Sequence, residues 1–188
     1  MFEKIYEFYK SDILFLYHYT PFSRENKLQS ETDKHIMNIK NQEIYNSKSS
    51  DSWKGEKREE SISFFKNALK ENFTNLVKLL PPDFSQKVLI SLVPSSTEKN
   101  YNNNMLNICE YLCEEFNFLN GLNILSRHYS VQKSHCCGGH REVLPHLKSI
   151  TVNTPKFIKD KSIILFDDVT TSGSSFQACK ELLLINGA

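Results

Sequence analysis

Residues 163–175, near the carboxyl end of the chain, combine the residue types that could bind a sugar phosphate. They read IILFDDVTTSGSS. The apolar run 163–166 is typical of a central strand buried on both faces. Asp167 and Asp168 follow where this strand should emerge, and residues 169–175 supply hydroxyls, small side chains and one glycine before an apolar helix. Backbone N–H groups in such a loop and at a helix N-terminus, with added hydroxyl donors, suit a phosphate.

The two carboxylates must serve another part of the ligand. Asp167 and Asp168 would repel a phosphate if they shared its cradle. Vicinal ribose hydroxyls fit better, because a carboxylate accepts hydrogen bonds from both, directly or through a magnesium-bound water. An alternative needs no ligand: a strand followed by an Asx turn and Ser/Thr helix caps. It explains each residue singly but not their ordered combination.

This segment resembles the phosphoribosyl pyrophosphate (PRPP) signature of the type I phosphoribosyltransferases. In that signature a hydrophobic strand leads into two acidic residues, an aliphatic residue and a Thr/Ser-rich loop with one glycine. The sequence DDVTTSGSS departs from it at Thr170, where an aliphatic residue is common. The resemblance implies that Asp167 and Asp168 are the catalytic pair and hold Mg2+, directly or through water. It also implies that the 5′-phosphate is bound by Thr170, Thr171, Ser172, Gly173, Ser174 and Ser175.

Upstream segments extend the resemblance, most closely to the ComF-like, competence-associated phosphoribosyltransferases. LISLVPSSTEKN (89–100) resembles the strand and Val-Pro loop of that group, and ILSRH (124–128) and HREVLPHLKSITVN (140–153) resemble its arginine-bearing segments. The sequence departs from the group at both ends: residues 1–80 contain no cysteine where a zinc module is common, and the chain stops at Ala188, which indicates a truncated or a shortened relative. The residues that the resemblance implies for pyrophosphate binding are Pro94, Ser95, Ser96, Arg127 and Arg141. The alternative for each arginine is a solvated surface residue.

The resemblance implies an enzyme that binds PRPP with Mg2+ and transfers phosphoribose to an unidentified nitrogen acceptor, releasing pyrophosphate. Catalysis of this kind depends on positioning and electrostatic stabilisation, so we nominate no covalent nucleophile. An alternative is a non-catalytic PRPP or nucleotide sensor, or a partner-binding module of a competence, DNA-uptake or phage-defence system. A homodimer or a protein partner is compatible with either interpretation.

The elements that must position these residues alternate along the second half of the chain. We expect strands at 87–93, 123–127, 149–152 and 162–166, helices at 104–117 and 175–185, and a loop at 129–141. This alternation predicts an α/β fold with a mainly parallel sheet flanked by helices. The resemblance implies that this sheet is the Rossmann-like sheet of the type I phosphoribosyltransferases. Ligands bind at the carboxyl ends of the strands of such a sheet.

The resemblance implies that residues 1–80 form a helical hood or cap that is not an independent domain, beside a core of residues 81–188. This region shows a possible strand at 13–19, a weak helix around 32–44 and a polar loop at 45–60. Apolar residues at three- and four-residue steps from Ile62 to Leu80 then predict a strong amphipathic helix that ends at Pro81. The region carries no motif that identifies an acceptor.

Composition limits the classes of partner and compartment. The net charge of +1 gives no reason to expect nucleic acid as a partner. The apolar run 13–17 is too short to span a membrane, so we expect a cytoplasmic protein with no membrane partner. Its five cysteines should then be reduced, and Cys109 and Cys113 lie on the apolar stripe of the helix at 104–117, which predicts core positions.

Three further features are less specific. The cluster SHCCGGH contains His135, Cys136, Cys137 and His140, but it lacks the spacing of a zinc site, and a mobile loop over the substrate or an ordinary surface loop is the stronger interpretation. His18 is expected to be a packed histidine. Trp53 could stack on a base or anchor its loop, and we prefer the second interpretation.

Overall fold

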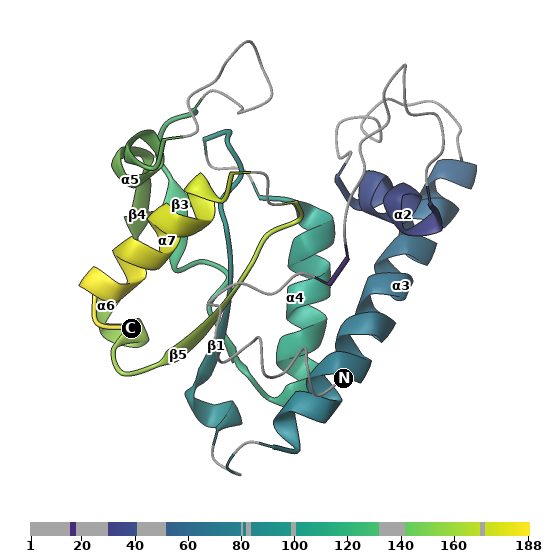
Figure 1. Cartoon of the computed structure of the whole chain (residues 1–188), viewed down its shortest axis with the longest axis horizontal. Coiled ribbons are helices and arrows are strands. Elements are labelled where there is room, and N and C mark those ends of the chain that lie inside the picture. Colours follow the sequence, from purple (N-terminus) through teal and green to yellow (C-terminus); the bar gives the residue numbers. More distant parts are fainter. Residues whose placement is uncertain are drawn as a thin grey trace.

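The computed structural model describes residues 16–17, 30–40, 52–79, 81, 84–98, 101–131, 142–169 and 172–188 (Figure 1). The helices are α2 (Glu31–Lys40), α3 (Ser52–Val77), α4 (Asn103–Phe116), α5 (Leu144–Ser149), α6 (Pro155–Ile158) and α7 (Ser174–Ile185), with a 3-10 turn η2 (Ser85–Lys87). The strands are β1 (Val88–Leu92), β2 (Leu119–Asn120), β3 (Leu125–Arg127), β4 (Ile150–Val152) and β5 (Ser162–Phe166). In the described part of the chain, no helix is both long enough and apolar enough to cross a membrane.

A three-stranded parallel sheet lies at the centre of the fold, with the strand order β2-β1-β5. Strand β1 is the central one, and all five of its residues are buried. The prediction that 162–166 is the central, fully buried strand is therefore wrong for the described residues, because β5 is an edge strand and mostly half-buried. An apolar run reports that the faces of a strand are covered, but not how many strands lie beside it.

Strands β3 and β4 lie outside the parallel sheet and pair with each other in antiparallel fashion. They correspond to the predicted strands at 123–127 and 149–152, each shorter or shifted by a residue or two. The chain is therefore an α/β protein in which helices flank a short parallel sheet, with a separate β3-β4 ribbon beside it.

Successive residues of β1 point into two different cores. Val88, Ile90 and Leu92 pack in one hydrophobic cluster with residues of α2, α3 and α4, and Leu89 and Val93 pack in a second cluster with residues of α7, β3 and β4. Figure 1 shows this division, with α4 and α3 on one side of β1 and α7 on the other. Cys109 and Cys113 of α4 are buried in the first cluster, which confirms their predicted core positions.

Helices α2 and α3 pack against each other and join the first cluster. The predicted helix from Ile62 onward is part of α3, but the predicted loop at 45–60 is wrong for residues 52–60, where α3 has already begun. Its first turns carry GEKREE, and Glu, Lys and Arg favour helices even without an apolar stripe. The weak helix expected at 32–44 is confirmed as α2 over the residues described. The predicted strand at 13–19 lies outside the described residues except for Leu16 and Tyr17, which form no strand.

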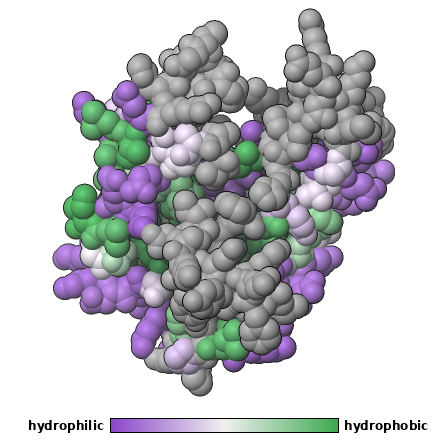
Figure 2. Space-filling view, in the orientation of Figure 1, coloured by the Kyte–Doolittle hydropathy of each residue, from purple (hydrophilic) through white to green (hydrophobic). Residues whose placement is uncertain are grey.

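The surface over α5, α6 and α7 mixes polar and apolar side chains (Figure 2). Leu144, Phe157, Leu184 and Ile185 are the large apolar residues exposed on these three helices. Hydrophilic patches separate the hydrophobic ones on the face shown.

Candidate functional site

The carboxyl ends of β1 and β5 meet at one edge of the parallel sheet. The two strands run in register, with Leu92 opposite Phe166. The backbone N–H of Val93 donates to the carbonyl of Phe166 at 2.8 Å. The loop that begins at Pro94 and the acidic pair that begins at Asp167 therefore leave the sheet side by side. The structure brings together two of the predicted site segments that are far apart in the sequence.

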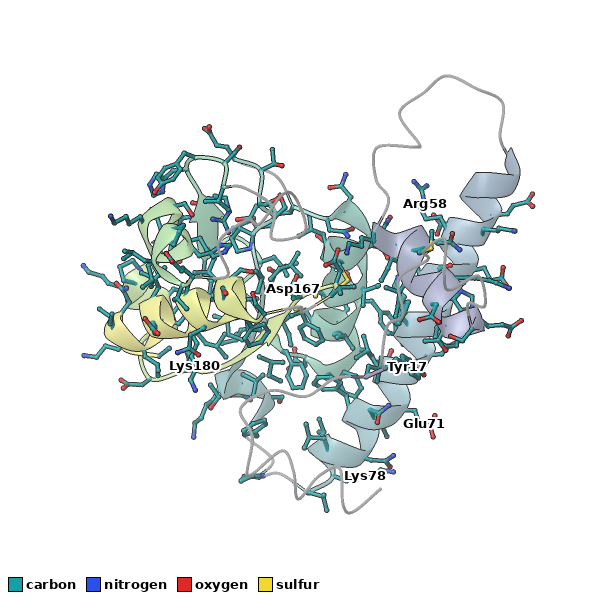
Figure 3. The ribbon with its side chains drawn as sticks, turned by 45° about the horizontal axis from the view of Figure 1, so that its top comes forward. Tyr17, Arg58, Glu71, Lys78, Asp167 and Lys180 are labelled. Atoms are coloured by element: carbon teal, nitrogen blue, oxygen red, sulfur yellow. The ribbon has the colours of Figure 1, made fainter. Side chains whose placement is uncertain are left out.

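Backbone N–H groups hold both carboxylates of the acidic pair. The N–H of Asp168 donates to Asp167 Oδ1 at 2.9 Å, and the N–H of Val169 donates to Asp168 Oδ1 at 2.6 Å. The side-chain amide of Asn102 donates to Asp168 Oδ2 at 3.3 Å. Both aspartates are half-buried, and Figure 3 shows Asp167 in the interior of the view, whereas Lys180 and Glu71 lie toward its periphery. The pair is thus oriented by the protein itself.

Burial and mutual repulsion perturb the acidic pair. Burial, with the negative charge of Asp168 as the second cause, holds the pKa of Asp167 well above its ordinary value of 3.8. The N–H of Asp168 and the charge of Lys40 oppose this rise in pKa. Two carboxylates that cannot comfortably ionise together favour a cation between or beside them.

The donor set fits Mg2+ bound together with a phosphate ligand. Among the described residues, no group of three or more His, Cys, Asp or Glu side chains could hold a metal ion. Mg2+ needs fewer protein ligands than that, since it is commonly bound by one or two carboxylates together with substrate phosphates and waters. Asp167 and Asp168 are the residues that would hold it.

The loop after the acidic pair enters α7 through a glycine. Gly173 is the N-cap residue, with φ of 72° and ψ of 5° in the left-handed region, where an L side chain costs about 1–2 kcal/mol. The first intrahelical bond runs from the N–H of Gln177 to the carbonyl of Gly173. The N–H groups of residues 174–176 therefore precede it and lie at the positive end of the helix.

Hydroxyl groups at this helix end face one another. Ser172 Oγ and Ser174 Oγ are 2.9 Å apart, and Ser174 is buried while Ser175 is half-buried. Thr170 and Thr171, the other two residues of the predicted phosphate loop, lie outside the described residues.

The loop after β1 rests on a buried arginine. Arg127 is 1% exposed. Its Nε donates to the carbonyl of Ser95 at 2.6 Å, one terminal nitrogen donates to Ser149 Oγ, and the other lies 3.3 Å from His146 Nδ1. The alternative that Arg127 is a solvated surface residue is therefore wrong. Its contact with Ser95 fixes the backbone of the predicted pyrophosphate loop.

The acceptors around Arg127 leave its charge uncancelled. Burial lowers the pKa of Arg127. Burial, together with the charge of Arg127, lowers the pKa of His146, so this imidazole stays neutral and can accept at Nδ1. Because the acceptors that bind Arg127 are neutral, its positive charge raises the electrostatic potential beside residues 94–96, which favours an anion there.

Residues 95–98 are also tied to the segment that follows β3. The N–H of Val131 donates to the carbonyl of Ser96 at 2.8 Å, and the N–H of Glu98 donates to Ser130 Oγ at 3.0 Å. Arg141 and the SHCCGGH cluster follow this segment and lie outside the described residues, as do His18 and the side chain of Trp53. The roles predicted for them stay predictions.

Sequence reasoning missed Asn102 and the buried state of Arg127. Asn102 is the N-cap of α4, and the signal was present, because asparagine before an apolar helix is a common cap. Arg127 lies two residues after Leu125 on β3, and alternate residues of a strand share a face. Since Leu125 is fully buried, this spacing could have indicated a buried arginine.

Comparisons with known proteins add no evidence to that of the residues described above. No protein-family model, curated protein or solved structure significantly matched the chain. The resemblance to the phosphoribosyltransferases therefore remains an expectation from the sequence of residues 163–175, 89–100, 124–128 and 140–153.

Proposed function

We propose that this protein is a phosphoribosyltransferase-like enzyme that binds PRPP with Mg2+ and transfers phosphoribose to a nitrogen acceptor. The observation that carries the proposal is the meeting of two parts at the ends of β1 and β5: the loop 94–96 and the acidic pair, with the glycine-led start of α7 following the pair in the chain. Each part suits a different portion of PRPP, and the type I phosphoribosyltransferase form of the fold belongs to the same proposal.

The site divides the ligand by charge and hydrogen-bonding type. Asp167 and Asp168 accept from the ribose hydroxyls. The 5′-phosphate lies at the N-terminus of α7, bound by N–H groups and by the hydroxyls of Ser172, Ser174 and Ser175, with Thr170 and Thr171 added by resemblance. The pyrophosphate lies against residues 94–96, whose backbone Arg127 holds, and Arg141 is assigned to the same group by resemblance.

The reaction requires orientation more than covalent chemistry. The bond between the anomeric carbon and the pyrophosphate oxygen breaks, and its electron pair leaves with pyrophosphate. The lone pair of the acceptor nitrogen forms the new bond, and the nitrogen then loses a proton to solvent water. A bound Mg2+ supplies positive charge for the leaving pyrophosphate. The carboxylates orient the ribose ring, and the positive end of α7 holds the 5′-phosphate, so that the anomeric carbon faces the acceptor.

The described cysteines support a mechanism without a covalent nucleophile. Cys109, Cys113 and Cys179 are buried, and burial raises the pKa of all three thiols, with that of Cys179 reaching about 12. A buried thiol with a raised pKa is a poor nucleophile.

Calorimetric titration of Mg2+ and PRPP tests the proposal. The wild-type protein should bind, and Asp167→Asn with Asp168→Asn should weaken binding more than about 100-fold, because two charge-assisted contacts are lost. Asp160→Asn is the matched control, since Asp160 is exposed, lies just before β5 and has a φ of 57° that asparagine tolerates. It should leave affinity unchanged. Undiminished binding by the folded double variant would refute the assignment.

A sensor that binds PRPP without turnover is the second candidate. The link between Asn102 and both Asp168 and Ile39 of α2 favours it, because it connects the acidic pair to the N-terminal helices. Isotope exchange separates the two candidates. Labelled pyrophosphate entering PRPP in the presence of candidate acceptors supports the enzyme, whereas tight binding without exchange favours the sensor.

A further inference from the structure

Asn102 contacts three separate parts of the fold through one side chain. Its Oδ1 accepts from the N–H groups of Asn104 and Met105, at 3.0 and 3.3 Å, and so caps α4. Its Nδ2 donates to the carbonyl of Ile39 at 3.0 Å and to Asp168 Oδ2 at 3.3 Å. One amide thus joins the start of α4, the end of α2 and the acidic pair.

Helix capping alone does not require asparagine at this position. Aspartate and serine cap helices about as well as asparagine does. Aspartate would place a carboxylate against the carbonyl of Ile39 and the carboxylate of Asp168, and serine is too short to donate to both. Only a carboxamide supplies an acceptor for the cap and two N–H donors for the other two partners.

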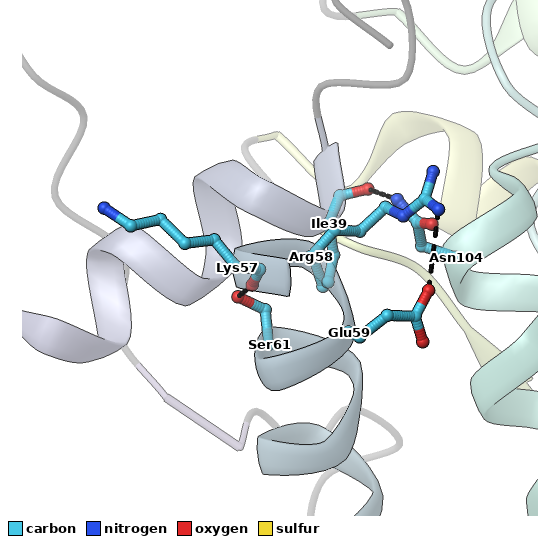
Figure 4. Close-up of polar contacts among 6 residues, drawn as sticks. All are labelled: Ile39, Lys57, Arg58, Glu59, Ser61 and Asn104. Carbon is cyan, nitrogen blue, oxygen red and sulfur yellow. Dashed lines mark hydrogen bonds and ion pairs between the residues drawn. The ribbon is translucent and has the colours of Figure 1, made fainter. Parts of the chain in front are cut away.

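The carbonyl of Ile39 belongs to the last described turn of α2. It accepts from two amides, Asn102 and Asn104, and the Asn104 bond is 2.9 Å long (Figure 4). Both amides therefore fasten α2 to the start of α4, but Asn102 is the one with a hydrogen bond to Asp168. This difference makes Asn104 a matched control.

Both oxygens of Asp168 are held from different sides. Oδ1 accepts from the N–H of Val169 and Oδ2 accepts from Asn102. These two bonds set the rotation of the carboxylate. Ile39 is itself 3% exposed and packs in the same core as β1. A shift of α2 would therefore move the Ile39 carbonyl, which accepts from the same Asn102 amide as Asp168 does.

We propose that Asn102 is a positioning residue that orients the Asp168 carboxylate for its ligand and couples occupation of the site to the packing of α2. The identity of the ligand rests on the proposed function. Under this proposal the N-terminal helices respond to the sugar phosphate through Asn102.

Calorimetry with Mg2+ and PRPP tests the positioning role. Asn102→Ser keeps a capping oxygen and removes both donors, and it should weaken binding about tenfold. Asn104→Ser removes only the other bond to Ile39 and should stay within about twofold of wild type. Thermal unfolding should first show that both variants are folded. Equal losses of affinity in the two variants would then show a merely structural role and overturn the proposal.

Hydrogen exchange tests the coupling to α2. Adding Mg2+ and PRPP should slow exchange of the α2 amides, residues 31–40, in the wild type and in Asn104→Ser. The slowing should be absent in Asn102→Ser at saturating ligand. Equal slowing in all three proteins would contradict the coupling.

A stability cycle tests the contact without any ligand. Asn102→Asp should lower the unfolding temperature, and Asp168→Asn in the same protein should recover much of the loss, because donor and acceptor are exchanged. Additive effects of the two changes would overturn the inference, even if PRPP binds. If the wild type fails to bind PRPP, the proposed function fails, and recovery in this cycle still supports the Asn102 contact.

Discussion

The ends of β1 and β5 lie side by side, yet they place their charged residues in opposite ways. The end of β5 presents two half-buried carboxylates that backbone N–H groups orient. The end of β1 presents backbone, and its nearby charge, Arg127, is buried beneath the loop and bonded to Ser95. In the proposed site, the acidic pair contacts the ligand, whereas the arginine acts through the loop that it supports.

The largest effect expected from this contrast is on folding stability at the β1 side. Arg127→Met should lower the free energy of unfolding by about 3 kcal/mol, because Ser95, His146 and Ser149 lose a shared partner inside the protein. Chemical denaturation measures this loss. Lys156→Met removes a cation from an exposed site and should stay within about 0.5 kcal/mol of wild type.

The same contrast predicts that changes to the acidic pair, unlike a change at Arg127, do not lower stability. Asp167→Asn with Asp168→Asn should retain or gain stability, because it removes repulsion between two carboxylates while it abolishes binding. A strong loss of stability in this variant, or an Arg127→Met protein as stable as wild type, would contradict the view that the acidic pair contacts the ligand whereas Arg127 supports the loop.

A smaller effect is the pH dependence of folding stability, whose sign should differ between Asp167 at the end of β5 and His146 beside Arg127. Because the pKa of Asp167 is raised in the folded state, its stabilising contribution is complete below pH 3.8 and is lost as pH rises toward the folded pKa. Because the pKa of His146 is lowered, its contribution is complete above pH 6.5 and is lost as pH falls toward the folded pKa.

Unfolding free energies measured across pH for three proteins check these signs. Relative to wild type, Asp167→Asn should remove the contribution to the unfolding free energy that falls as pH rises. His146→Gln should remove the contribution that falls as pH decreases. Differences of the same sign in both variants would contradict the opposite perturbation of the two groups.

The long elements of the second half could be predicted because their patterns are local. The strands at 87–93 and 162–166 and the helices at 104–117 and 175–185 appear as β1, β5, α4 and α7, each within about one residue at its ends. The short elements could not, since β2 has two residues and α6 four, too few to show a period. The polar start of α3 was misread because it lacks an apolar stripe.

The site was predictable where chemistry is encoded by residues adjacent in sequence. Asp167, Asp168 and Gly173 follow one another within a single strand-loop-helix segment, and parallel pairing of β5 with β1 then places the loop 94–96 beside them. Asn102 depends on contacts with Ile39 and Asp168, which are distant in sequence. Burial of Arg127 depends on Ser95, Ser149 and His146 meeting around it. The cap position of Asn102 and the strand spacing of Arg127 are visible in the sequence, but the distant partners that these side chains meet are not.

A crystal structure of the protein with Mg2+ and ribose 5-phosphate tests the central claim most directly. The ribose hydroxyls should lie within hydrogen-bonding distance of the carboxylates of Asp167 and Asp168. The phosphate should lie at the N-terminus of α7, bound by the N–H groups of residues 174–176 and by the hydroxyls of Ser172, Ser174 and Ser175. A ligand bound elsewhere, or an empty site at a ligand concentration that saturates binding in solution, would contradict the account.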